Sequence, residues 1–337
     1  MLSCSGRPGF GYDLAMSPAS ELLHRLARLN VDRSNGQRKP HKPLLMLCAI
    51  QRWVVRGQRE FAYVDVERQL RPLLDLYAPP VKGAHHPEYP YWYLQSDGVW
   101  ELPQARALER NAKGFPTIEA FRTSAGRIPE PYATALAADP RLAEQAVQLL
   151  LDEHFEPSLH ADLREAIGLQ DLAPMQAAMS TYDLVAESPQ LESTVPTALV
   201  QRRPRSASFR NDVLAAYDHR CAVTGFQALI GRTLFCLEAA HVHWHSQGGP
   251  STVDNGIPLS PTMHKLFDHG AWSLTDDRRI LVSKQFSGSD EAITMLRPLQ
   301  GKPIRSPKSD VDALRIDFIR WHREPKLGGV FRWPAIA

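Results

Sequence analysis

Five of the chain's thirteen histidines lie between residues 241 and 269, and this stretch also contains Asn255. The pattern predicts a strand that reaches His241, a return loop that contains Asn255, a second apolar run, and a helix that carries His264. In such a strand–strand–helix unit the three side chains converge on one point. Mg²⁺ needs only one or two protein ligands and keeps open positions for water and phosphate, so the convergence favours a metal site for phosphodiester hydrolysis.

The same stretch resembles HNH endonucleases of the ββα-metal type. The resemblance covers residues 207–285 and is carried by these motifs: Cys221-Ala222-Val223-Thr224-Gly225, Glu238-Ala239-Ala240-His241, Asp254-Asn255-Gly256, Leu259-Ser260 and His264-Lys265-Leu266-Phe267-Asp268. It implies that His241 is the general base for the attacking water. It also implies that Asn255 holds the loop and orients this histidine, and that His264 binds a divalent metal ion, Mg²⁺ or Mn²⁺.

One position departs from the pattern of that family. Many such nucleases have an aspartate ligand directly before the general base, where this chain has Ala240. A second ligand must then come from one of several groups: His243, His245, Asp268, His269 or water. Asp268 lies one helical turn after His264, so both face the same side of the predicted helix. We assign both to the metal, although Asp268 could instead be a helix-end carboxylate bonded to the backbone.

The four cysteines, Cys4, Cys48, Cys221 and Cys236, contain no CxxC pair. This argues against a disulfide framework and fits a reducing cytoplasm, in keeping with a prokaryotic cytoplasmic protein. Many HNH proteins hold a structural zinc ion on four cysteines. Cys221 and Cys236 alone cannot do this, so we expect no structural zinc.

The N-terminal half contains a second set of motifs. The segments HKPLLML (residues 41–47) and EYPYWYLQSDGVWEL (residues 88–102) resemble the sulfur-binding domain of phosphorothioate-dependent restriction endonucleases. The resemblance covers about residues 18–170 and implies that Tyr89 and Pro90 form the pocket that receives sulfur. Sulfur is larger and less hydrated than oxygen, so a discriminating pocket should present apolar surface on which oxygen loses its hydration without compensation. The alternative is that Tyr89-Pro90 only forms a turn.

Basic side chains must still hold the charge of the phosphate. His41 and Lys42 are assigned by the resemblance to the polar wall of the sulfur pocket, beside Arg38 and Lys39. These residues lie in a stretch with six basic residues between Arg25 and Lys42. A further basic residue is expected later in the chain, and four candidates stay open: Arg106, Arg110, Lys113 and Arg122.

The segments around these motifs predict an α+β chain. Helices are expected after Ser17, over residues 43–56, 67–77 and 138–168, and from Phe209; strands are expected within residues 59–66 and as a hairpin around Asp97-Gly98. We predict a mostly helical sulfur-binding domain at 18–170 and a linker at 171–206. An HNH nuclease domain with a C-terminal extension follows at 207–337. The aromatic residues of the extension could follow a phosphate backbone or pack onto the nuclease domain.

Charge divides the chain into three blocks. Residues 1–130 carry 18 Lys and Arg against 13 Asp and Glu, residues 131–201 carry 2 against 11, and residues 202–337 carry 19 against 13. Two basic blocks that flank an acidic one are compatible with a polyanionic partner or with solvated surface charge. No apolar run is long enough to span a bilayer, and no signal peptide is apparent, so no membrane partner is expected.

Together these patterns predict a modification-dependent DNA endonuclease, comparable to type IV restriction enzymes, that recognises double-stranded phosphorothioated DNA and hydrolyses phosphodiester bonds nearby. A homodimer is expected, because one HNH site cuts one strand at a time. Three alternatives stay open: a nuclease dependent on another modification such as a methylated base, a non-cleaving DNA-binding module with a degenerate HNH domain, and an interaction protein with coincidental histidines.

Overall fold

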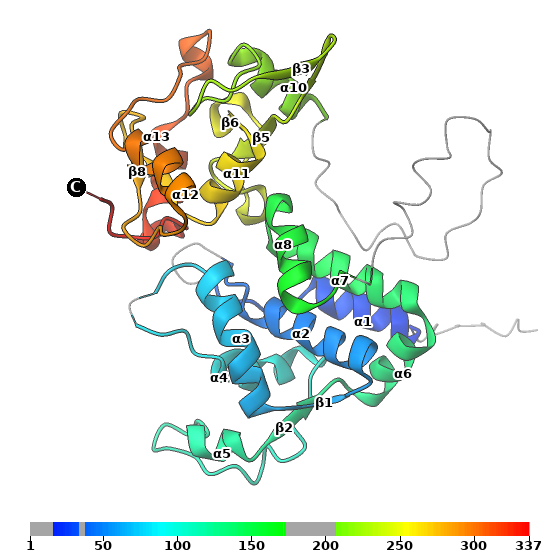
Figure 1. Ribbon diagram of the computed structural model, residues 1–337. Helices are drawn as coiled ribbons and strands as arrows, with labels where there is room; N and C mark the ends of the chain where they lie inside the picture. Colours follow the sequence, from blue (N-terminus) through cyan, green and yellow to red (C-terminus); the bar gives the residue numbers. More distant parts are fainter. Residues whose placement is uncertain (1–15, 34–37, 82, 171, 173–206, 337) are drawn as a thin grey trace, which may run out of the picture.

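The computed structural model describes residues 16–33, 38–81, 83–170, 172 and 207–336, so nearly all of the predicted linker lies outside the described residues. Figure 1 shows two bodies. The first, coloured blue to green, is a bundle of helices with one small pair of strands. The second, coloured green to red, combines short strands and short helices, and helix α8 lies where the two bodies meet.

The N-terminal half is built around one buried helix. Every residue of α2 (His41–Arg56) from Lys42 to Gln51 is buried, and Gly57 ends the helix in a left-handed conformation with φ 66°. Five helices of this half pack against it: α3 (Tyr63–Tyr77), α4 (Glu88–Tyr93), α6 (Glu130–Ala138), α7 (Pro140–His154) and α8 (Pro157–Ile167). Helix α1 (Pro18–Ala27) packs on α6 and α7, and α5 (Ile118–Arg122) packs on α3. The helices expected at 43–56, 67–77 and 138–168 therefore form, the last as two helices.

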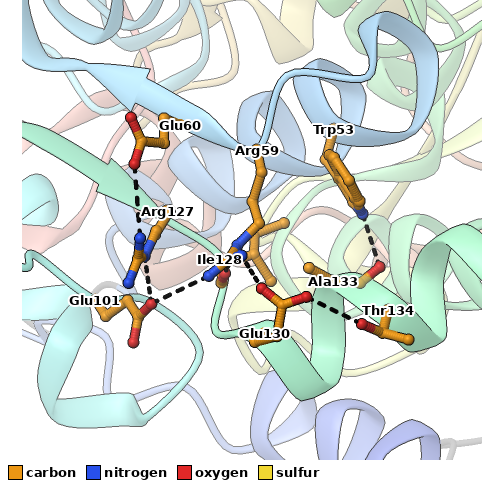
Figure 2. Close-up of polar contacts among 9 residues, drawn as sticks. All are labelled: Trp53, Arg59, Glu60, Glu101, Arg127, Ile128, Glu130, Ala133 and Thr134. Atoms are coloured by element: carbon orange, nitrogen blue, oxygen red, sulfur yellow. Dashed lines mark hydrogen bonds and ion pairs between the residues drawn. The ribbon is translucent and has the colours of Figure 1, made fainter.

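Strands β1 (Glu60–Ala62) and β2 (Ala125–Arg127) pair antiparallel at one edge of this bundle. Figure 2 shows the charged network that joins them to their surroundings. Glu101 accepts hydrogen bonds from Arg127 at 2.5 Å and from Arg59 at 3.4 Å, and Arg59 also pairs with Glu130 of α6. The Trp53 indole donates to the carbonyl of Ala133 at 2.8 Å and so connects α2 to α6.

One strand prediction in this half is wrong. Residues 91–102 form no hairpin: they continue α4 into a 3-10 helix over Leu94–Asp97, and Gly98, with φ 71°, ends that helix instead of turning a hairpin. Tyr91 of α4 and Trp100, which lies beyond the 3-10 helix, both point into the core, with ring centroids 5.7 Å apart. The short strand expected within residues 59–66 does form, as β1, and α3 begins at Tyr63, earlier than the helix predicted over 67–77.

The C-terminal half begins with helix α10 (Ala207–Ala216). Its strands form antiparallel pairs: β3 (Ala228–Ile230) with β4 (Thr233–Phe235), β5 (Glu238–His241) with β6 (Gly256–Leu259), and β7 (Trp272–Leu274) with β8 (Ile280–Val282). Helix α11 (Pro261–Asp268) directly follows β6, so β5, β6 and α11 form the predicted strand–strand–helix unit. Helices α12 (Asp290–Leu296) and α13 (Ile316–Arg323) complete this half.

The aromatic residues of the C-terminal extension mostly pack inward. Phe318, Trp321 and Phe331 are buried, whereas Trp333 is 39% exposed. Of the two possibilities for this segment, packing is therefore the one that the structure supports for three of the four rings. No helix among the described residues is long and apolar enough to cross a membrane.

The hydrophobic core crosses the boundary between the halves. One cluster lies within the C-terminal half, but the larger N-terminal cluster also includes Trp244, Trp321 and Val330. The two halves therefore share a continuous apolar contact.

Candidate nuclease and sulfur-reading sites

The loop between β5 and β6 is closed by the buried side chain of Asn255. Its carboxamide oxygen accepts the His243 backbone N–H at 2.8 Å, and its Nδ2 donates to the carbonyls of His243 at 2.9 Å and Pro250 at 2.8 Å. The side chain is completely buried, so all three bonds are shielded from water. Asn255 thus holds both sides of the loop that follows His241.

His241 ends β5 and is only partly buried. Its ring stacks on Phe209 of α10, with centroids 4.1 Å apart and an interplanar angle of 10°, and its Nε2 lies 3.1 Å from the Ser251 hydroxyl. Gly256 is the β6 partner of His241, and a Cβ there would come within 2.3 Å of Val213 and 3.0 Å of Phe209. Glycine therefore lets α10 approach closely enough for Phe209 to support the His241 ring.

His264 on α11 lies between two carboxylates. Its Nδ1 is 2.7 Å from Glu238 Oε2, and its Nε2 is 3.1 Å from Asp268 Oδ2. Burial alone would lower the pKa of His264, but the charges of and hydrogen bonds with Asp268 and Glu238 raise it to about 10. The two carboxylates differ in access, since the side chain of Glu238 is 46% exposed and that of Asp268 is 1% exposed.

Asp268 has a full set of partners. Its Oδ1 accepts from the Trp244 indole at 2.9 Å, and its Oδ2 accepts from the Ser158 hydroxyl as well as from His264. Burial pushes the pKa of Asp268 upward, but the charge of His264 and the hydrogen bonds from His264 and Ser158 outweigh burial and leave the pKa lowered. A buried carboxylate with three donors is placed to orient His264.

Glu238 shares a strand face with Ala240, because alternate residues of β5 point the same way. The side chain of glutamate is longer than that of aspartate. Glu238 therefore reaches the His264 imidazole although it lies two positions before the site where related nucleases have aspartate. Within the described residues no group of three or more His, Cys, Asp or Glu is arranged around a common metal position. One carboxylate oxygen and one imidazole nitrogen nevertheless fit a Mg²⁺ or Mn²⁺ ion that keeps most of its positions for water and phosphate.

The other residues considered as ligands make contacts away from Glu238. The His243 ring stacks on Trp321 with centroids 4.3 Å apart, and the His269 ring lies 5.6 Å from Tyr77 and faces Asp162 at 3.9 Å. The His245 ring lies 5.5 Å from that of His241. The sequence did not predict Glu238 and Ser251 as site residues. Glu238 begins the motif that ends at His241, and its position two residues before Ala240 was the signal that it could replace the missing aspartate.

In the N-terminal half, Tyr89 belongs to a cluster of rings on the surface. Its ring centroid lies 5.2 Å from His86, 5.4 Å from Phe115 and 6.5 Å from Tyr93, and Tyr89 is 49% exposed. Pro90, the next residue of α4, is buried. We call His86, Tyr89, Tyr93 and Phe115 the Tyr89 cluster; it offers partly exposed apolar and aromatic surface.

At the start of α2, Lys42 is buried and His41 is partly buried. The His41 ring meets His85 edge-on at 5.4 Å, and burial, followed by the charge of His85, lowers the pKa of His41 to about 3. Lys42 Nζ lies 2.6 Å from Asp97 Oδ2, and the two side chains are 11% and 5% exposed. His41 is therefore neutral at neutral pH, and the charge of Lys42 is compensated within the chain.

The remaining basic candidates separate by their partners. Lys39 pairs with Asp32 at 2.7 Å, and the Arg38 backbone N–H donates to Gln247 of the C-terminal half at 2.8 Å. Arg122 pairs with Glu119 at 3.1 Å. The Arg110 guanidinium lies over the Trp92 ring at 5.4 Å, and this ring is 6.2 Å from Phe115 of the Tyr89 cluster. Of these, Arg110 is the cation whose contacts connect it to the cluster.

The fold and the two sites define a DNA-acting protein with a recognition module and a nuclease module. Residues 19–172 match the family model of the ScoMcrA-like DNA sulfur-binding domain, and residues 221–275 match that of an HNH endonuclease domain. The chain therefore carries a ScoMcrA-like DNA sulfur-binding domain followed by an HNH endonuclease domain. We call residues 16–172 the reader domain and residues 207–336 the nuclease domain. No curated protein matches the chain.

Several solved structures are similar to parts of the chain. The sulfur-binding domain of ScoMcrA complexed with phosphorothioated DNA is 27% identical over 44% of this chain and 96% of that chain, with a TM-score of 0.41. That of SprMcrA, also complexed with phosphorothioated DNA, is 22% identical over 46% and 96%, with a TM-score of 0.36. The type IV phosphorothioation-dependent restriction endonuclease ScoMcrA is 17% identical over 72% and 93%, with a TM-score of 0.40.

Proposed function

We propose that the chain is a modification-dependent restriction endonuclease that recognises phosphorothioated DNA and hydrolyses phosphodiester bonds near the modification. The observation that carries this proposal is the presence of both family matches on one chain, reader first and nuclease second. A reader without a nuclease would only bind, and a nuclease without a reader would cut without regard to sulfur. The boundaries that we propose are residues 18–170 for the reader, 171–206 for a linker and 207–337 for the nuclease with its extension.

The contacts of His241 support its role as general base. Phe209 fixes the plane of the ring and Ser251 contacts one nitrogen, while Asn255 keeps the adjoining loop closed. The water oxygen bonds to phosphorus as its proton passes to the imidazole of His241, the bond from phosphorus to the leaving oxygen breaks, and that oxygen takes up a proton from solvent. The protonated imidazole returns its proton to solvent after the product leaves.

We propose Glu238 and His264 as the protein ligands of the divalent metal ion, with Asp268 orienting His264 instead of binding the metal directly. The exposed carboxylate of Glu238 faces Nδ1, whereas Asp268 occupies Nε2 and is buried. When bound, Mg²⁺ or Mn²⁺ supplies positive charge that stabilises the phosphate oxygens as negative charge builds up. Because His264 must lose its Nδ1 proton to act as a ligand, metal binding releases a proton.

For recognition we propose that the sulfur meets the Tyr89 cluster, with Pro90 beneath it and Arg110 as the nearby cation. We assign His41 and Lys42 a supporting role instead of a direct charge contact with the phosphate, because His41 is neutral and Lys42 is paired with Asp97. An apolar surface that cannot replace the hydration of an oxygen is suited to select sulfur. Each nuclease site cuts one strand, so we also propose a homodimer for a double-strand break.

The test compares two plasmids of identical sequence, one phosphorothioated and one plain, each incubated with the chain and Mg²⁺, Mn²⁺ or a chelator. We expect the modified plasmid to be cut only when metal is present and the plain plasmid to remain intact. A methylated plasmid is included as a third substrate. Cutting of that plasmid alone assigns the chain to another modification, and binding of modified DNA without cutting at any metal concentration makes it a non-cleaving reader.

A further inference from the structure

The reader and nuclease domains meet through polar contacts between α8 and α11. The Ser158 hydroxyl at the start of α8 donates to Asp268 at the end of α11, and one turn further along α8 Asp162 Oδ1 accepts from Lys265 Nζ at 2.5 Å. Glu156, just before α8, accepts from the backbone N–H of Ser246 at 2.9 Å and from its hydroxyl at 2.8 Å. Figure 1 shows α8 at the junction of the two bodies, next to α11.

The contact with Asp268 reaches the nuclease site itself. Asp268 holds Nε2 of His264, the histidine that we propose as a metal ligand. A carboxylate in this position fixes the ring orientation and keeps the proton on Nε2, so that Nδ1, which faces Glu238, is the nitrogen that would bind the metal once its own proton is lost. Anything that moves Asp268 therefore moves or rotates the ligand.

Besides His264, two side chains donate hydrogen bonds to Asp268, and both depend on the reader domain. Ser158 belongs to the reader domain, and its hydroxyl reaches Oδ2. Trp244 belongs to the nuclease domain and donates to Oδ1, but its indole is part of the hydrophobic cluster that forms the reader core. Separation of the two domains would remove the first donor and would leave the second without its packing.

We propose, on the basis of the function assigned above, that Ser158 of the sulfur-binding domain is a positioning residue for the nuclease: its hydroxyl holds Asp268 and, through it, orients the metal ligand His264. The reader domain thereby does more than deliver the nuclease to a modified site. Its docking on α11 supplies part of the shell that sets the affinity of the nuclease for its metal ion.

The test uses the full chain with Ser158→Ala, and Mn²⁺ binding is measured by isothermal titration without DNA. Loss of an outer-shell partner typically lowers metal affinity by about 10- to 100-fold, and since Ser158 acts one bond further out we expect about 10-fold. Ser158→Thr keeps a hydroxyl and should restore most of the affinity. Ser20→Ala serves as the matched control, because it removes a reader hydroxyl that bonds only locally to Ser17.

A second variant, Trp244→Phe, removes the indole donor but keeps an aromatic ring in the reader core. It should also lower Mn²⁺ affinity, while the affinity of each variant for phosphorothioated duplex should stay within about twofold of the unaltered chain. If Ser158→Ala and Trp244→Phe, both folded, bind Mn²⁺ as tightly as the unaltered chain, Ser158 has no positioning role, although the proposed function still stands. Absence of Mn²⁺ binding by the unaltered chain would overturn the metal site and this inference together.

Discussion

At the nuclease site side chains meet through charged hydrogen bonds, whereas at the Tyr89 cluster they meet through the faces and edges of rings. His264 has a carboxylate on each nitrogen, at 2.7 and 3.1 Å. Tyr89 has ring neighbours at 5.2 to 6.5 Å and remains half exposed. Catalysis requires a few atoms at fixed positions, while selection of sulfur over oxygen requires a surface that forms no hydrogen bond. The two sites therefore differ in how much a single substitution should cost.

The largest expected effect is at the general base. His241→Ala should lower the rate of cleavage by about 10²- to 10⁴-fold, because the imidazole that takes the proton from water is lost. Binding of phosphorothioated duplex, measured by fluorescence anisotropy, should remain unchanged since the reader is intact. His24→Ala, on α1 of the reader, is the control. Simultaneous loss of binding and cleavage in a folded His241→Ala protein would contradict the separation of the two sites.

The next effect concerns stability of the reader. Lys42→Ala leaves Asp97 buried without its cation, and breaking a buried pair in this way typically costs about 3–5 kcal/mol. Urea denaturation should show this loss, and Lys284→Ala provides a lysine control at an exposed position. Lys42→Ala/Asp97→Asn should recover part of the stability. A Lys42→Ala protein of unchanged stability with weakened DNA binding would indicate instead that Lys42 leaves Asp97 to hold phosphate.

A smaller effect is expected at the proposed metal ligand. Glu238→Gln keeps the size of the side chain but removes its charge, so Mn²⁺ affinity should fall by roughly 10- to 100-fold. Excess Mn²⁺ should then restore part of the cleavage that is lost. Asp268→Asn distinguishes the two carboxylates: its affinity loss should be accompanied by destabilisation, because Asp268 is buried with three donors and Glu238 is half exposed.

At the Tyr89 cluster the expected effect is about 1–3 kcal/mol, or roughly ten- to a hundredfold in affinity. Tyr89→Ala should weaken binding of duplex with a single phosphorothioate by this factor and leave binding of the matched plain duplex nearly unchanged. Arg110→Ala should weaken both duplexes and lower the salt dependence of binding. A Tyr89→Ala protein that keeps its full preference for sulfur would place the pocket elsewhere on the reader.

The smallest effect is a pH dependence at the domain interface. Burial, followed by the charge of Asp268, raises the pKa of Glu156 from 4.5 to about 7. The folded chain therefore binds more protons than the unfolded chain between these values, and its stability falls as the pH rises through this window. Glu156→Gln removes that dependence, so its Tm at pH 8 should exceed that of the unaltered chain by about 2 °C. At pH 5 the difference should be smaller.

The nuclease unit could be predicted from sequence because its information is local. His241, Asn255 and His264 lie on consecutive elements, and β5, β6 and α11 follow one another in the order that the sequence predicted. The ring contacts of the reader depend on which face of α4 is buried, and the Tyr-rich segment there favoured strands by propensity although tertiary packing made it helical. The role of Ser158 could not be predicted at all, since Ser158 and Asp268 are 110 residues apart and only packing of the domains brings them together.

The indole of Trp244 packs in the reader core and also donates a hydrogen bond to Asp268, the carboxylate that holds His264. This has a consequence for protein engineering by domain exchange. A nuclease domain grafted onto a different reader would bring Trp244, Trp321 and Val330 to its surface as an uncovered apolar patch, unless the new reader presented a matching face. Productive chimaeras therefore need a reader whose surface covers these three side chains, because α7 packs against α1, α2 and α6 inside the reader bundle and cannot be moved with the nuclease without uncovering the reader core.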